Sequence, residues 1–342
     1  MRQPKVRQED IARAVGVSVS TVSRVLSGAP GISRATTQKV LQAASDLGTP
    51  LAVPGGIAEP AKGRIKRALL VQMQRDLNSG SGSIYHFVMT GLQKAAAEAG
   101  LKIELALLGD DGAIPQQILG EPETGVLFAG VDPGLDVMKS LRDQGHPTVL
   151  VNGLDPTMIH DQVAPNNYFG GWLAAQYLMD MGHRRILQLG TRRRPTLAAR
   201  TAGFLAAVKQ PGFEDVSCDN IDMENVNELS AHETMKDLLS QGPFPYSAVF
   251  CAADVVALSV MQDLRTSGYD VPGDVSLLGF NGLPLAEFSS PLLSTLYVDW
   301  QHLGTEAIRL LISRSLEPAS PTHQILTQVT LKPGDSVRRS KN

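Results

Sequence analysis

The chain has 342 residues, 43% of them hydrophobic, which is enough for two or three globular domains with apolar cores. No apolar run reaches the roughly 18 residues of a membrane-spanning helix, and no signal-peptide core is present, so the sequence predicts a cytoplasmic protein. Its two cysteines, Cys218 and Cys251, are too few for a disulfide framework or a cysteine metal cluster.

Charge is distributed unevenly along the chain. Residues 1–67 carry eleven Lys and Arg against four Asp and Glu, a net charge of +7. Because the whole chain has a net charge of −3, the remaining residues carry −10. A basic segment on an acidic body is typical of a protein that contacts phosphate at one end only. The N-terminal segment is therefore expected to bind nucleic acid.

Three short helices are predicted in this basic segment. Gly16 ends the first, Ser18 caps the second, and the third runs from its cap at Ser33 to Gly48. Apolar side chains recur at helical spacing on the inner faces of the first two helices; these are Ile11, Ala12, Val15, Val22, Val25 and Leu26. Two such short, closely joined helices predict a helix-turn-helix.

The outer face of the second helix predicts a DNA-reading surface. Small side chains let a helix enter the major groove, and one guanidinium contacts a base or a phosphate. A small helical bundle without a partner is the alternative. The expected DNA-contacting residues are Arg7, Ser18, Val19, Ser20, Thr21, Ser23 and Arg24.

The N-terminal segment resembles the headpiece of the lactose/galactose repressor family, which reads DIA-x-x-x-GVS-x-x-TVSRVL-x-G. Residues 10–28 and 33–48 follow that pattern, and the resemblance extends to about Ser336. It implies an all-α helix-turn-helix headpiece followed by a bilobed, periplasmic-binding-protein-like (type I) α/β body. In the family, bases are read at the positions of Val19, Ser20 and Arg24. Arg7 replaces a common Thr, so it offers a phosphate contact in place of a cap.

A linker over residues 51–67 joins the headpiece, residues 1–50, to the body. Members of the family usually have a short helix here whose leucine wedges into the minor groove and kinks the operator. Pro54, Gly55 and Pro60 disfavour a helix in this chain. The sequence therefore disfavours that hinge helix, and a wedge formed by Leu51, Val53 or Ile57 is the alternative.

The body, residues 68–336, alternates short apolar runs with amphipathic helices, a pattern typical of parallel α/β structure. The runs ALLVQM, IELALL and TGVLFAG fall in a first unit, and RRILQLG, YSAVFCAA and VSLLGF fall in a second. We predict two parallel-sheet subdomains. The N-subdomain covers about 68–164 and 298–318, and the C-subdomain about 165–297 and 319–336.

Ligands of open α/β sheets bind beyond the carboxyl ends of the strands, which in two lobes face one cleft. Residues that follow predicted strands are therefore candidates, and the resemblance adds an aromatic opening the first body helix, an Arg ahead of Gly203-Phe204 and an aromatic that stacks on a sugar. The expected effector-binding residues are Tyr85, His86, Asn152, Arg193, Arg200, Asp254, Asn281 and Trp300.

Alternatives remain for several of these residues. Tyr85 and Trp300 could be core aromatics, and Arg200 could form a surface ion pair. Asn281 stands at the position of the Asp in the family's Gly-Phe-Asp motif, which binds sugar through its carboxylate. The Asn281 amide can donate as well as accept hydrogen bonds. The run Arg192–Arg194 is either a solvated loop or a site for an anionic effector such as a sugar acid or sugar phosphate.

Together these features predict a homodimeric transcriptional regulator, most simply a repressor of carbohydrate-utilisation genes. A small sugar or sugar derivative would change its affinity for a near-palindromic DNA operator. We expect no cofactor, no metal and no enzymatic activity, because no catalytic triad, metal-ligand spacing or phosphate-binding glycine loop is present. The alternatives are control by a partner protein, or a solute-binding protein, which would need an export signal.

Overall fold

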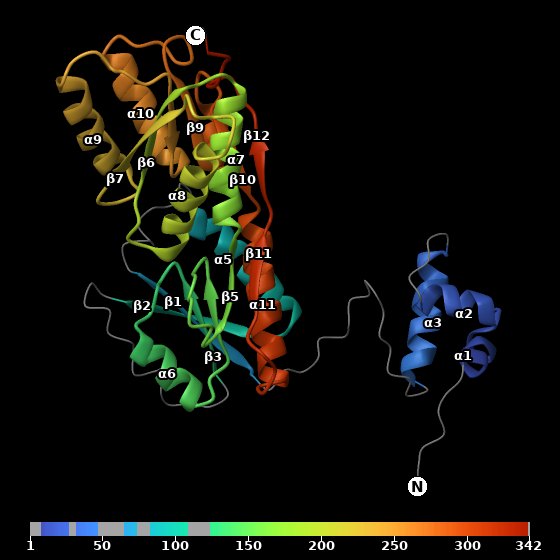
Figure 1. Ribbon diagram of the computed structural model, residues 1–342. Helices are drawn as coiled ribbons and strands as arrows, with labels where there is room; N and C mark the ends of the chain where they lie inside the picture. The colour runs from blue at the N-terminus through green and yellow to red at the C-terminus, as the bar shows by residue number, and fades with distance from the viewer. Residues whose placement is uncertain (1–7, 27–31, 47–64, 74–82, 109–123, 341–342) are drawn as a thin grey trace. The chain divides into compact units, whose positions relative to one another are not determined.

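The computed structural model describes residues 8–26, 32–46, 65–73, 83–108 and 124–340 (Figure 1). The chain divides into two compact units, Met1–Ala61 and Lys62–Asn342, called the headpiece and the body below. Arg7 and most of the predicted linker, with the question of a hinge helix, lie outside the described residues. No helix in the described ranges is long and apolar enough to cross a membrane.

The headpiece contains three helices, as expected: α1 (Gln8–Val15), α2 (Val19–Leu26) and α3 (Arg34–Asp46). Each contributes apolar side chains to one small core, which excludes water from the centre of the bundle. The buried residues are Ile11, Ala12, Val22, Val25, Val40 and Ala44.

The first lobe of the body holds a parallel six-stranded sheet in the order β11-β5-β4-β3-β1-β2. Strands β3 and β4 are buried along their whole length, as expected for parallel strands covered on both faces. Its elements are β1 (Arg67–Met73), α5 (Ile84–Glu98), β2 (Lys102–Leu108), β3 (Thr124–Ala129), α6 (Leu135–Asp143), β4 (Thr148–Val151), β5 (Asp161–Pro165), α11 (Trp300–Leu316) and β11 (Gln324–Thr327).

The second lobe holds a sheet in the order β12-β10-β9-β8-β6-β7, in which only the β10–β12 pairing is antiparallel. In Figure 1 the second lobe lies above the first, and each sheet has helices beside it. The elements of this lobe are α7 (Asn167–Asp180), β6 (Arg185–Gly190), α8 (Pro195–Val208), β7 (Ser217–Asp222), α9 (Glu228–Ser240), β8 (Ala248–Cys251), α10 (Asp254–Thr266), β9 (Ser276–Asn281), η3 (Pro284–Phe288), β10 (Ser294–Val298) and β12 (Val329–Lys332).

The chain crosses between the lobes after β5, after β10 and after β11. The last crossing corrects the sequence-based division, which placed residues 319–336 in the second lobe. β11 pairs with β5 in the first sheet, from Gln324 beside Gln162 to Thr327 beside Pro165. The chain changes sheets at residue 328, within a run of polar and apolar residues that shows no break in the sequence.

Glycines allow two helix pairs to pack backbone against backbone. A Cβ atom on Gly91 of α5 would collide with the carbonyl oxygen of Gln301 in α11, and one on Gly304 would collide with the backbone of α5. Gly171 and Gly203 play the same part between α7 and α8 in the second lobe. This close packing fixes the starts of α5 and α8, which carry candidate site residues.

We predict that Gly91→Ala lowers the free energy of unfolding of the body by about 1–3 kcal/mol, because the added methyl group overpacks the α5–α11 contact. Urea unfolding followed by circular dichroism measures the change. Gln93→Ala, on the exposed face of the same helix, is the control and should change stability by less than about 0.5 kcal/mol. Equal stabilities of the two variants would contradict the close contact.

Candidate DNA-binding surface and ligand cleft

The turn between α1 and α2 has the geometry that the sequence predicts. Gly16 adopts the left-handed conformation, with φ of 73°, and ends α1. Ser18 Oγ accepts a hydrogen bond from the backbone N–H of Thr21 at 3.1 Å, and Ser33 Oγ accepts one from Thr36 at 3.2 Å. Both predicted helix caps are confirmed.

The outer face of α2 is open to solvent and carries short side chains. Ser18, Val19, Ser20, Ser23 and Arg24 are exposed, with Val19 43% exposed at the start of the helix. Valine at this point offers an apolar contact of the kind that thymine methyl groups receive in a major groove. Thr21 is half-buried, and its hydroxyl lies 2.8 Å from that of Ser18, so it supports the turn.

In the body, Tyr85 lies at the carboxyl edge of the first sheet. Tyr85 lies in the first turn of α5, and its backbone N–H donates a hydrogen bond to the side chain of Ser83, the N-cap of the helix. The Tyr85 hydroxyl rests on Gly130, directly after β3, where a Cβ atom would leave it no room. Asn152, directly after β4, donates to this hydroxyl from Nδ2 at 3.1 Å. Two predicted site residues are thus brought together.

Arg194, at the start of α8 in the second lobe, reaches across to these first-lobe residues. Its guanidinium donates to both carboxylate oxygens of Asp132, at 2.8 and 3.3 Å, to the Asn152 carbonyl at 2.9 Å and to the Tyr85 hydroxyl at 3.2 Å. Burial opposes the charged form, but Tyr85 and Asp132 outweigh it and raise the pKa of Arg194. Arg194 therefore connects the lobes.

Of the run Arg192–Arg194, which the sequence offers as a solvated loop or an anion site, only Arg193 was expected among the effector-binding residues. Arg193 is exposed and faces Glu224 at 3.6 Å on its own lobe. The distinguishing signal was Pro195, the first residue of α8, because an arginine directly before a helix-opening proline stands at the cleft edge of a parallel sheet.

Arg200, on α8, is buried and joins three segments of the second lobe. Its Nε and Nη2 atoms donate to Asn167 Oδ1 at 3.2 and 2.6 Å, and Nη1 donates to the Ala252 carbonyl. The guanidinium stacks on the Phe280 ring at 3.4 Å from its centroid. Burial lowers the pKa of Arg200 to about 9. The alternative of a surface ion pair for Arg200 is therefore wrong.

Asp254, the first residue of α10, is completely buried. Its two oxygens accept hydrogen bonds from the Thr295 hydroxyl at 2.5 Å and from the backbone N–H of Leu283 at 2.7 Å. Burial raises the pKa of Asp254 to about 7, against the opposing effect of these hydrogen bonds. Both oxygens are engaged by the protein, so Asp254 supports the loop after β9.

The remaining predicted residues differ in exposure. Trp300 is only 4% exposed, packs in the core and donates from Nε1 to the Asn281 carbonyl at 2.9 Å. Asn281 ends β9 with φ of 113° and is also buried. His86 faces solvent on α5, edge-on to Phe87. The structure thus joins Trp300 to Asn281 and leaves His86 apart from both.

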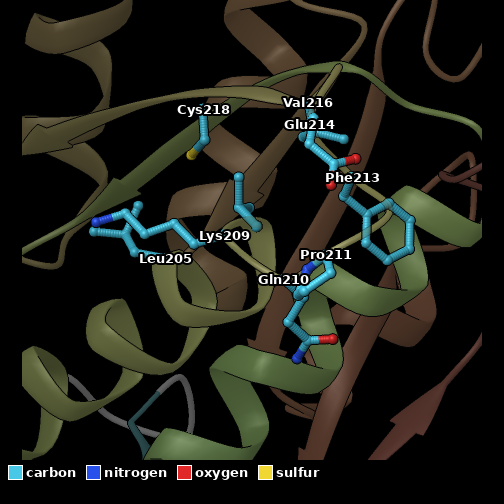
Figure 2. A pocket seen from close by; sticks show the side chains of 9 residues that line it. Leu205, Lys209, Gln210, Pro211, Phe213, Glu214, Val216 and Cys218 are labelled. Carbon is cyan, nitrogen blue, oxygen red and sulfur yellow. The ribbon is translucent and has the colours of Figure 1, made fainter.

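Two hollows open on the second lobe, and neither is lined by first-lobe residues. The first, about 450 Å³, lies between α8 and β7 (Figure 2) and is lined by Leu205, Val208, Lys209, Gln210, Pro211, Phe213, Glu214, Val216 and Cys218. The second, about 490 Å³, lies beyond the carboxyl ends of β6 and β7 and is lined by Thr191, Arg192, Arg193, Asp222, Met223 and Glu224.

The fold and these sites define a class: a helix-turn-helix DNA-binding regulator with a bilobed ligand-binding body. Sequence models of two families match the chain, "Bacterial regulatory proteins, lacI family" over residues 9–48 and "Periplasmic binding protein-like domain" over residues 175–337, together more than half of it. The protein belongs to the LacI family of bacterial transcriptional regulators.

Named relatives are similar in sequence to this protein along almost its whole length. The Ribose operon repressor of Escherichia coli (strain K12) is 28% identical over 338 residues, covering 96% of this chain and 99% of its own. The transcriptional repressor PurR of Photobacterium profundum is 28% identical over 314 residues, covering 90% of this chain and 91% of its own. The structure titled "transcriptional regulator CelR-cellobiose complex" has 26% identity and a TM-score of 0.69, covering 97% of this chain and 100% of its own.

The buried carboxyl of Asp254 gives a testable pH dependence. Because its folded-state pKa lies above the ordinary 3.8, Asp254 stabilises the fold fully only below about pH 4, and this contribution is lost as the pH rises through about 7. Between pH 5 and pH 8, the wild type should lose about 1–3 kcal/mol of unfolding free energy more than Asp254→Asn, whose side chain stays neutral.

Urea unfolding at the two pH values measures this difference. Asp143→Asn, which removes an exposed carboxylate from the end of α6, should follow the wild type. Parallel pH profiles of the wild type and Asp254→Asn would contradict the assignment.

Proposed function

We propose that this protein is a repressor of carbohydrate-utilisation genes that acts in the bacterial cytoplasm by binding alone, without catalysis. Two headpieces of a homodimer read the half-sites of a near-palindromic operator, about one helical turn apart. The observation that carries the proposal is the exposed face of α2, where small side chains and Arg24 surround a capped turn. We assign DNA contact to Arg7, Ser18, Val19, Ser20, Thr21, Ser23 and Arg24.

A small sugar or sugar derivative binds between the lobes of the body. Supporting this, a relative carries the name Ribose operon repressor, and a similar structure is titled as a cellobiose complex. Tyr85 and Asn152 offer hydrogen-bonding groups from the first lobe, and His86 and Arg193 lie exposed at the starts of α5 and α8. Four buried residues of the proposed site position the surrounding segments: Arg200, Asp254, Asn281 and Trp300.

The ligand alters DNA affinity by favouring one arrangement of the lobes. It can shift that equilibrium only by its difference in affinity for the two arrangements. Contacts that cross between the lobes, such as those of Arg194, are where such a difference arises.

Arg24→Ala is expected to weaken specific operator binding by about 1–3 kcal/mol, because it removes a guanidinium from the face that enters the groove. Fluorescence anisotropy with DNA from upstream of the protein's own gene, compared with a scrambled duplex, measures the loss. Arg142→Ala, on α6 of the body, removes the same charge away from the headpiece and should bind like the wild type. Wild-type affinity in Arg24→Ala would exclude this face of α2 from DNA recognition.

A further inference from the structure

The bond between Arg194 and Asp132 has the geometry of anion recognition. Two nitrogens of one guanidinium donate to the two oxygens of one carboxylate, at 2.8 and 3.3 Å. Arginine binds carboxylate and phosphate ligands through the same planar, two-point contact. The Asp132 carboxylate therefore occupies the position that an anionic group of a ligand would take.

The guanidinium is held in place by groups other than Asp132. The Tyr85 hydroxyl and the Asn152 carbonyl, both on the first lobe, accept from its Nη1 and Nη2 atoms. The Tyr85 hydroxyl is itself fixed by Asn152 Nδ2 and by contact with Gly130. Removal of Asp132 would leave an oriented guanidinium whose charge lacks a counterion.

Asp132 is well placed to leave. It lies in the loop after β3, and its side chain is 30% exposed, so its carboxylate can turn into water. Among the described residues, Arg194 is the group that forms its ion pair and hydrogen bonds. The two-point contact and the partial burial make this ion pair stronger than an exposed surface pair, so an anion must form comparable contacts with Arg194 to displace Asp132.

The surroundings of Arg194 also favour an anion. Arg200 lies buried on α8, and its acceptors among the described residues are uncharged, the Asn167 amide and the Ala252 carbonyl. Burial lowers the pKa of Arg200, the nearby Asp254 raises it, and the charge of Arg194 lowers it further. The two guanidinium groups thus repel each other, and a bound anion would offset that repulsion.

We propose that Asp132 is a built-in substitute for the ligand, and that the effector carries a carboxylate or phosphate group that displaces Asp132 from Arg194. This inference rests on the proposed function and specifies its ligand as a sugar acid or sugar phosphate. Displacement exchanges a lobe-to-lobe ion pair for a ligand contact. It therefore gives the ligand different contacts in the two lobe arrangements, which regulation requires.

Three proteins test the exchange: the wild type, Asp132→Asn, and the double variant Asp132→Asn with Arg194→Gln. The probes are inorganic phosphate and acetate, followed by glucose, gluconate and glucose 6-phosphate, titrated calorimetrically at constant ionic strength. Asp132→Asn should bind phosphate or acetate at least tenfold more tightly than the wild type, because no resident carboxylate competes. The double variant should lose this binding.

The two anion types distinguish a carboxylate effector from a phosphate effector, and glucose reports binding without charge. Asp222→Asn frees Arg192 from its own carboxylate partner on the second lobe and is the matched control; it should behave like the wild type. Adding Arg194→Lys to Asp132→Asn keeps the positive charge but not the two-point contact. This double variant should retain only part of the anion affinity gained in Asp132→Asn alone.

Anion affinities within twofold of one another in all three proteins, or no anion binding to Asp132→Asn, would overturn the proposal. Tighter binding of glucose than of both its anionic derivatives would also overturn it. Operator binding is measured on the same preparations. Specific DNA binding without any anion effect would refute this inference alone, whereas loss of specific DNA binding by the wild type would refute the proposed function.

Discussion

The ligand cleft of the body depends on how its two sheets of mostly parallel strands are oriented. The carboxyl ends of the parallel strands in both sheets meet where Arg194 crosses from one lobe to the other. That crossing needs two helices to begin at fixed points. Glycines on α5 and α7 let α11 and α8 approach at backbone distance, so Tyr85 and Arg194 stand at opposite edges of one cleft. The Arg194 side chain then spans the lobes with hydrogen bonds to a carboxylate, a carbonyl and a hydroxyl.

The second lobe gains rigidity from buried polar groups. Burial of a guanidinium or a carboxyl group is unfavourable unless hydrogen bonds satisfy it. Arg200 is satisfied by Asn167 and Ala252, and Asp254 by Thr295 and Leu283, so each group ties together segments far apart in sequence. A lobe cross-linked in this way can move as one body. Rearrangement is then concentrated in the three crossings and in contacts between lobes, where a ligand can act.

Local chemistry made much of this predictable. Capping serines and helical spacing identified the headpiece, and apolar runs identified the central strands of both sheets. The passage of β11 into the first sheet was not predictable, because residues 324–332 contain no Gly or Pro that would mark a change of sheet. Which of Arg192, Arg193 and Arg194 crosses the cleft depends on where α8 begins, and the sequence marks that point only through Pro195. The burial of Trp300 depends on tertiary packing in the same way.

The central claim is that the state of the cleft sets the affinity of the headpieces for DNA. Fluorescence anisotropy of the full-length protein on DNA from upstream of its own gene, with and without a panel of sugars, sugar acids and sugar phosphates, tests it most directly. The account predicts specific binding that one compound changes severalfold, and that no longer responds to that compound when Tyr85 is replaced by Phe. Specific binding that responds equally well in Tyr85→Phe would contradict the account, because the response would then not arise in this cleft.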